Sequence, residues 1–200
     1  MDNFVYLASQ SPRRSQLLEQ LGVHYELLLP DANEDAEALE VVLENEAPAA
    51  YVKRVTRLKL EAAVARLKQR QLIAAPVLCA DTSVALGRII YGKPQDANDA
   101  ERMLAELSGQ THRVLTSVAL HSEQQLYEAL SSSRVSFEAM TKLQISAYVA
   151  TGEPMGKAGA YAVQGRAAAY ISRINGSYSG IMGLPLCETS LLLRRAGLNI

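Results

Sequence analysis

Short apolar runs and segments of helical periodicity alternate along the first half of this chain. Residues 4–8 and 76–80 are unbroken runs of apolar and small side chains, which is typical of buried strands. Residues 12–21 and 47–71 place apolar side chains three and four positions apart, as amphipathic helices do. With a further strand pattern over 24–29, this half of the chain predicts alternating strands and helices.

Strand patterns dominate the middle of the chain. Residues 84–91 predict a hairpin that turns near Gly87, and residues 96–107 predict a helix with Asp96 as its N-cap. Residues 113–121, 125–130 and 134–137 predict three strands of an antiparallel meander. A helix over 141–150, a strand over 167–174 and a last helix over 185–195 complete the predicted elements. No repeat or linker interrupts them, so we expect one domain over residues 1–200, with a mixed α/β sheet, helices on its faces and two lobes.

The charge balance narrows the classes of ligand. Lys and Arg number 20 and Asp and Glu 21, which gives a formal net charge of −1 and favours neither nucleic acid nor a membrane surface as a partner. An anionic ligand would have to be held by local charge.

The start of the chain resembles no signal peptide, and no apolar run has the length of a membrane span, so we expect a soluble cytoplasmic protein. Cys79 and Cys187 lie in apolar segments and predict two buried free thiols.

Two serines and two arginines mark the junction of the first strand and the first helix. Ser9, Ser11, Arg13 and Arg14 surround the predicted helix start. A helix N-terminus offers unpaired N–H groups, and guanidinium groups add charge and bidentate donors, so this corner suits a phosphate or a carboxylate. The same residues also fit a plain helix start, with Ser11 as N-cap, Pro12 at the first helical position and two surface arginines.

Carboxylates and lysines in predicted loops complete the candidate chemistry. Asp81 follows the apolar run 76–80, and the carboxyl end of such a strand is where α/β sheets place ligands, although an Asp there also caps turns. Glu34 lies in an acidic loop, and Lys93 and Lys157 lie in other loops. Carboxylates can hold Mg²⁺ or Mn²⁺ or deprotonate water, and cations neutralise phosphate oxygens. No side-chain nucleophile stands out, so water is the simplest one for chemistry on a phosphorylated substrate.

Six motifs in order resemble the Maf family of nucleoside triphosphate pyrophosphatases, and they span nearly the whole chain. They are Ser9-x-Ser11-Pro12-Arg13-Arg14, Ala80-Asp81-Thr82, Gly92-Lys93-Pro94, the run from Leu107 to His112, the run from Lys157 to Gly165, and Gly176-Ser177-Tyr178 followed by Gly183-Leu184-Pro185-Leu186. The resemblance implies hydrolysis between the α and β phosphates, a divalent metal (Mg²⁺ or Mn²⁺), and a mixed α/β sheet bent around a central cleft, related to that of inosine triphosphate pyrophosphatases. It also implies a homodimer.

The resemblance assigns roles to individual residues. Asp81 matches the family's proton acceptor, which activates water and helps to hold the metal. Ser9, Arg13, Arg14 and Lys93 match positions that contact phosphate or substrate, and Lys59 matches the lysine of a helix motif that begins at Arg54. Glu34 matches an acidic metal or base position, although Asn33 replaces the more usual acidic neighbour. Asp31 or Asp35 could share that role.

Three positions resemble the branch of the family that acts on dTTP and UTP. Arg13, Thr82 and Gln164 stand where the branch acting on 7-methyl-GTP has an aromatic residue, Gln and Glu. A Gln amide has a donor and an acceptor that match the edge of uracil or thymine. We therefore expect a dTTP/UTP pyrophosphatase that also admits modified pyrimidine triphosphates. The alternative is a non-catalytic nucleotide-binding regulator of cell division and septum formation.

Overall fold

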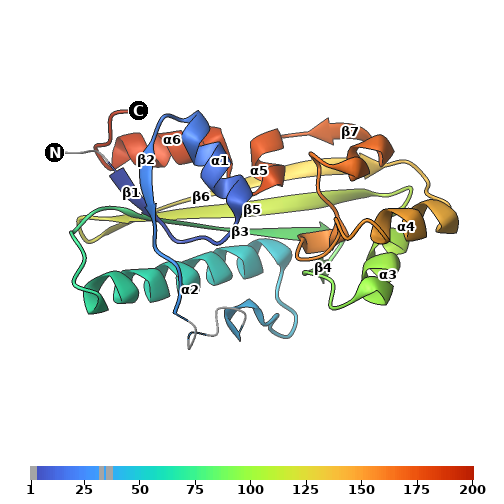
Figure 1. Ribbon diagram of the computed structural model, residues 1–200, viewed down its shortest axis with the longest axis horizontal. Coiled ribbons are helices and arrows are strands. Elements are labelled where there is room, and N and C mark those ends of the chain that lie inside the picture. Colours follow the sequence, from blue (N-terminus) through green and yellow to red (C-terminus); the bar gives the residue numbers. More distant parts are fainter. Residues whose placement is uncertain (1–3, 32–33, 35–37) are drawn as a thin grey trace.

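The computed structural model describes residues 4–31, 34 and 38–200. Within these residues, seven strands form one mixed sheet in the order β2-β1-β3-β5-β6-β7, and β4 pairs with the far end of β3 (Figure 1). The strands are β1 Phe4–Leu7, β2 His24–Leu27, β3 Val77–Leu86, β4 Ile89–Tyr91, β5 Thr111–Ser122, β6 Gln125–Phe137 and β7 Ile171–Asn175. β1 is parallel to β2 and β3, and the other pairs are antiparallel. The predicted mixed α/β sheet is confirmed.

Helices cover both faces of the sheet (Figure 1). They are α1 Pro12–Gln20, α2 Pro48–Gln69, α3 Ala97–Leu107, α4 Lys142–Val149, α5 Tyr178–Met182 and α6 Leu186–Arg195, with short 3-10 turns η1 Ala38–Glu40, η2 Ala158–Ala160 and η3 Arg166–Tyr170. The long helix α2 packs on one face of β3 and β5, and α1 and α6 pack on the other. Burial on both faces explains why β3 is apolar on either side of its polar middle, Asp81–Ser83.

The part of the sheet near α3 and α4 has its own apolar cluster. Leu104 and Leu107 of α3 and Ile145 of α4 pack there against Val135 and Tyr161. Asp96 caps α3, as predicted, because its carboxylate accepts the N–H of Asp99. A second set of apolar clusters lies under α1, α2 and α6. The chain thus builds two apolar regions on one sheet, and β3 and β5 run through both.

Several predicted boundaries were wrong in ways that bear on the site. β3 does not end at residue 80 but continues to Leu86, so Asp81 lies in mid-strand, paired across the sheet with Ser117. β6 is one continuous strand, because the polar run Ser131–Ser133 keeps its pairing with β5. Residues 166–170 form the turn η3, and only 171–175 form a strand. Cys79 is buried as predicted, but Cys187 is exposed at the start of α6.

Candidate active site

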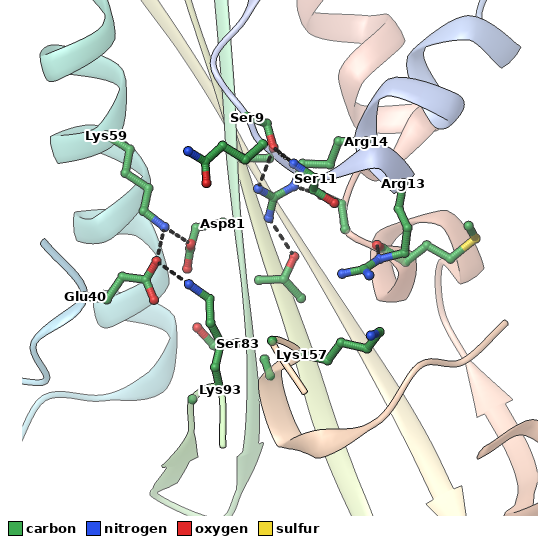
Figure 2. Close-up of a pocket in the computed structure, with 18 of the residues that line it drawn as sticks. Ser9, Ser11, Arg13, Arg14, Glu40, Lys59, Asp81, Ser83, Lys93 and Lys157 are labelled. Carbon is green, nitrogen blue, oxygen red and sulfur yellow. Dashed lines mark hydrogen bonds and ion pairs between the residues drawn. The ribbon is translucent and has the colours of Figure 1, made fainter. Parts of the chain in front are cut away.

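A cavity of about 720 Å³ lies between the sheet and its surrounding loops, and all the predicted site residues line it. They are Ser9, Arg13, Arg14, Glu34, Lys59, Asp81, Thr82, Lys93 and Gln164. These residues come from the β1–α1 junction, from α2, from the middle of β3 and from loops far apart in the sequence. Figure 2 shows carboxylates and lysines on one side of the cavity and arginines on another. We call these two groups the carboxylate wall (Glu40, Lys59, Asp81, Lys93) and the arginine wall (Ser9, Arg13, Arg14).

The carboxylate wall is a chain of ion pairs centred on Lys59. Its ammonium lies 2.6 Å from Oδ1 of Asp81 and 2.7 Å from Oε1 of Glu40. Lys93 approaches the same oxygen of Glu40 at 3.4 Å. The α2 helix therefore presents one lysine to two carboxylates that belong to β3 and to η1 (Figure 2).

Burial and pairing act in opposite directions on these groups. Burial disfavours the charged form of Lys59, but Asp81 and Glu40 outweigh it and raise the pKa of the lysine above its usual value. Burial also favours the neutral form of Glu40, yet Lys59 and Lys93 hold the pKa of that carboxyl below its usual range. Lys59 is thus an ammonium and Glu40 a carboxylate at neutral pH.

Glu34, the predicted metal or base residue, pairs with Arg66 of α2 in this structure. Its Oε1 accepts a hydrogen bond from Nε of Arg66 at 2.8 Å, and its Oε2 accepts one from the same guanidinium. The pairing with Arg66 lowers the pKa of Glu34 to about 2. Asp31 pairs with Arg70 at 2.6 Å, and Asp35, which was predicted as an alternative, lies outside the described residues.

Glu40 lines the cavity although no sequence pattern singles it out. It lies in the short turn η1, inside an acidic stretch where no periodicity or motif distinguishes one Glu from another. Its position depends on tertiary contacts: the hydroxyl of Tyr51 donates to the Glu40 carbonyl at 2.9 Å, and two lysines reach its side chain. Burial, followed by Asp81 and Glu40, raises the pKa of Tyr51 to about 12, so it remains a donor.

The arginine wall is fixed by backbone carbonyls at the end of α5. Arg14 donates through Nε to the Gly183 carbonyl at 2.8 Å, through Nη1 to the Ser9 hydroxyl at 3.2 Å and through Nη2 to Thr82 at 3.5 Å. Arg13 donates through Nε to the Met182 carbonyl at 3.2 Å. Gly183 has a φ of +125°, a conformation that side chains disfavour, and its carbonyl accepts from Arg14.

Ser11 occupies the N-cap position, but its side chain makes no cap hydrogen bond. Instead the Ser11 N–H donates to the Ser9 hydroxyl at 3.1 Å. Burial lowers the pKa of Arg13 below its usual value, and the neighbouring Arg14 adds to this shift. Burial and then Arg13 likewise lower the pKa of Lys157, which Figure 2 shows on the same side of the cavity as Arg13. Like charges held together in this way favour an anion between them.

Gln164 is held by the loop between α4 and β7. The next residue, Gly165, lies so close to the Glu153 carboxylate that a Cβ atom would collide with it. Glu153 is fixed by the hydroxyl of Tyr148 at 2.8 Å and by the Arg166 N–H at 3.1 Å. Glycine at this position therefore leaves room for the Glu153 carboxylate, and Gln164 itself lines the cavity.

The profile of the Maf family, described as Maf-like protein, matches residues 4–196. The chain belongs to the Maf family. Three similar curated proteins, each called dTTP/UTP pyrophosphatase, come from Albidiferax ferrireducens, Polaromonas sp. and Cupriavidus pinatubonensis. They are 68%, 68% and 61% identical to this chain and match it over 200, 198 and 199 residues. The aligned part covers 100%, 99% and 100% of this chain and 100%, 98% and 100% of those proteins.

A looser likeness links this Maf-family chain to a solved structure, the Ham1 protein of Staphylococcus aureus. The two share 14% identity with a TM-score of 0.38, over 67% of this chain and 70% of the other.

Among the described helices, none combines the length and the apolar character that crossing a membrane would require. The described residues also contain no cluster of three or more His, Cys, Asp or Glu side chains that would enclose a metal ion by themselves.

Proposed function

We propose that this Maf-family protein is a nucleoside triphosphate pyrophosphatase that acts on dTTP and UTP. The observation that carries the proposal is the facing pair of walls in one cavity, with cations fixed on one side and paired carboxylates on the other. Such an arrangement suits a polyphosphate chain and a water molecule that needs a base. The printed names of the 61–68% identical relatives agree with this reaction and with these substrates.

In the proposed reaction Asp81 accepts a proton from water, and the oxygen of that water attacks the α phosphorus of the substrate. The bond between the α phosphorus and the oxygen that bridges to the β phosphorus breaks, and the nucleoside monophosphate and pyrophosphate leave. Lys59 keeps the Asp81 carboxylate in place and balances its charge. Arg13, Arg14 and Lys93 neutralise the phosphate oxygens, and Ser9 supports Arg14 through its hydroxyl.

The proposal includes a divalent cation, Mg²⁺ or Mn²⁺, and the residues present fit one. Asp81 and Glu40 both lie within 2.7 Å of the Lys59 ammonium, so they are close neighbours. Two carboxylates with substrate phosphates and water are the usual set for Mg²⁺. When bound, the cation would neutralise phosphate charge. We assign the second carboxylate to Glu40 in place of Glu34, because Arg66 already engages both oxygens of Glu34.

Arg13, Thr82 and Gln164 are the proposed specificity residues, and all three line the cavity. A panel of nucleoside triphosphates, incubated with the purified protein and Mg²⁺ or Mn²⁺, tests the proposal. We expect dTTP and UTP to be consumed much faster than ATP, GTP and CTP. Equal rates on all of them would contradict the assignment of specificity. Nucleotide binding without hydrolysis would favour the non-catalytic regulator instead.

The proposal extends to a homodimer and to a cytoplasmic location, which follow from the family resemblance and the sequence pattern. Sedimentation equilibrium at micromolar protein concentration tests the first point. A mass of twice 21.7 kDa is expected, and the mass of one chain would contradict it.

A further inference from the structure

A short chain of hydroxyl groups lies behind Thr82. Thr82 on β3 directly faces Thr116 on β5 in the sheet register, and their Oγ1 atoms are 2.9 Å apart. Thr116 is only 1% exposed, and its Oγ1 lies 2.7 Å from the carbonyl oxygen of Gly180. Thr82 is half-buried and lines the cavity. The chain therefore runs from the cavity surface to a backbone carbonyl of α5.

The direction of the hydrogen bonds along this chain is determined by its buried end. A threonine hydroxyl has one proton to donate, whereas a carbonyl oxygen can only accept. Thr116 must therefore give its proton to Gly180, and Thr82 must give its own proton to Thr116. The guanidinium of Arg14, which can only donate, reaches Thr82 at 3.5 Å, and this contact is compatible with the same direction because it uses a lone pair of the Thr82 oxygen.

Thr82 consequently has its proton directed at Thr116 and one oxygen lone pair left for the cavity, beside the one that faces Arg14. A substrate group that meets this hydroxyl must be a hydrogen-bond donor. Uracil and thymine carry a hydrogen on ring nitrogen N3, whereas N3 of cytosine is an acceptor. Gln164 lines the same cavity, and its amide NH₂ can donate to a carbonyl oxygen beside N3.

We propose that Thr116 is a positioning residue for base selection, because it fixes Thr82 as an acceptor for the N3–H group of uracil or thymine. This inference rests on the proposed function. The hydroxyl of Thr116 selects the base without touching the substrate. Without that hydroxyl, Thr82 would be free to rotate and to donate its proton to N3 of cytosine.

The substitution Thr116→Val separates this role from a structural one. Valine keeps the β-branched shape that suits a strand, and Gly180 still accepts the N–H of Gly183 at 3.1 Å. The control Thr116→Ser keeps the hydroxyl and therefore the direction of the chain. The measurement is kcat/KM for UTP, dUTP and CTP with all three proteins, with pyrophosphate as the product detected.

We expect the wild-type protein and Thr116→Ser to prefer UTP over CTP strongly. Thr116→Val should narrow the UTP-to-CTP ratio by about three- to tenfold, the effect of one hydrogen bond. An equal fall in both rates, or an unchanged ratio, would overturn the inference and leave the proposed function intact. A change in the UTP-to-dUTP ratio in place of the UTP-to-CTP ratio would place Thr82 at the ribose and also overturn it.

A modified substrate tests the same point without any substitution, in case Thr116→Val fails to fold. UTP methylated at N3 lacks the donor, so the wild-type protein should hydrolyse it at least about tenfold less efficiently than UTP. Equal efficiency would refute the inference. Release of no pyrophosphate from UTP itself would refute the proposed function, and the inference with it.

Discussion

The two walls of the cavity hold their charged groups in different ways. On the carboxylate wall, Lys59 pairs with Asp81 and Glu40 from two other elements, so each charge is held by another side chain. On the arginine wall, Arg13 and Arg14 are held by the backbone carbonyls of Met182 and Gly183. A backbone carbonyl keeps its partner without a change of rotamer, whereas ion pairs between side chains can exchange partners. The arginine wall is thus preorganised for phosphate, and the carboxylate wall is built to rearrange around a cation and water.

Removal of the proposed base should have the largest effect. Asp81→Asn keeps the size of the side chain but cannot accept the proton from water, so kcat for UTP should fall by a factor on the order of 10²–10⁴. Steady-state release of pyrophosphate measures this. The matched control is Asp96→Asn, where asparagine still caps α3 and the residue lies outside the cavity lining. An Asp81→Asn rate equal to that of the control would remove Asp81 from the role of base.

The next test asks which glutamate belongs to the carboxylate wall. Glu40→Gln removes a charge beside Lys59 and Lys93, and we expect the Mg²⁺ or Mn²⁺ concentration for half-maximal activity to rise by a factor on the order of 10–100. Glu34→Gln should leave that concentration nearly unchanged, because Glu34 faces Arg66. A larger rise of that metal concentration in Glu34→Gln than in Glu40→Gln would assign the metal ligand to Glu34.

A smaller effect is expected on the arginine wall. Arg14→Lys keeps the charge but cannot reach Gly183, Ser9 and Thr82 together, because an ammonium lacks the planar fork of a guanidinium. The KM for UTP should rise about tenfold, with a smaller change in kcat. Arg173→Lys, on an exposed position of β7, is the control. A fall in kcat alone would show that Arg14 acts in the chemical step. It would contradict the view that the arginine wall mainly binds phosphate.

The smallest effect on activity should come from His112, which lies outside both walls. Burial lowers its pKa from 6.5 to about 4, and its Nε2 lies 2.8 Å from the hydroxyl of Tyr161. The unfolded chain therefore binds a proton at a pH where the folded protein does not. The stability that depends on neutral His112 is complete above about pH 6.5 and declines as the pH falls toward 4, by a total on the order of 3 kcal/mol.

Thermal unfolding between pH 7.5 and 4 measures this dependence. In His112→Gln, the midpoint should change less with pH over that range than in the wild-type protein, while the UTP-to-CTP ratio should stay the same. An equal slope in both proteins would show that His112 is not the group that titrates.

The sequence predicted the residues of the arginine wall better than the contacts of the carboxylate wall. Ser9, Arg13 and Arg14 lie together at one strand–helix junction, so local chemistry alone pointed to an anion site. Glu40 could not be found in this way, because it meets Lys59 only through the packing of η1 against α2. The mixed sheet followed from the hydrophobic pattern, whereas the position of Asp81 in mid-strand did not, since its polar neighbours Thr82 and Ser83 resemble a loop. The buried partner of Thr82, Thr116, depends on the register of β3 and β5.

The identity of the products formed from UTP tests the central claim most directly. With Mg²⁺ present, the wild-type protein should convert UTP to UMP and pyrophosphate in equal amounts, and Asp81→Asn should form very little of either. Phosphorus NMR of the reaction mixture distinguishes these products from UDP and orthophosphate. The appearance of UDP and orthophosphate in place of UMP and pyrophosphate would contradict the account.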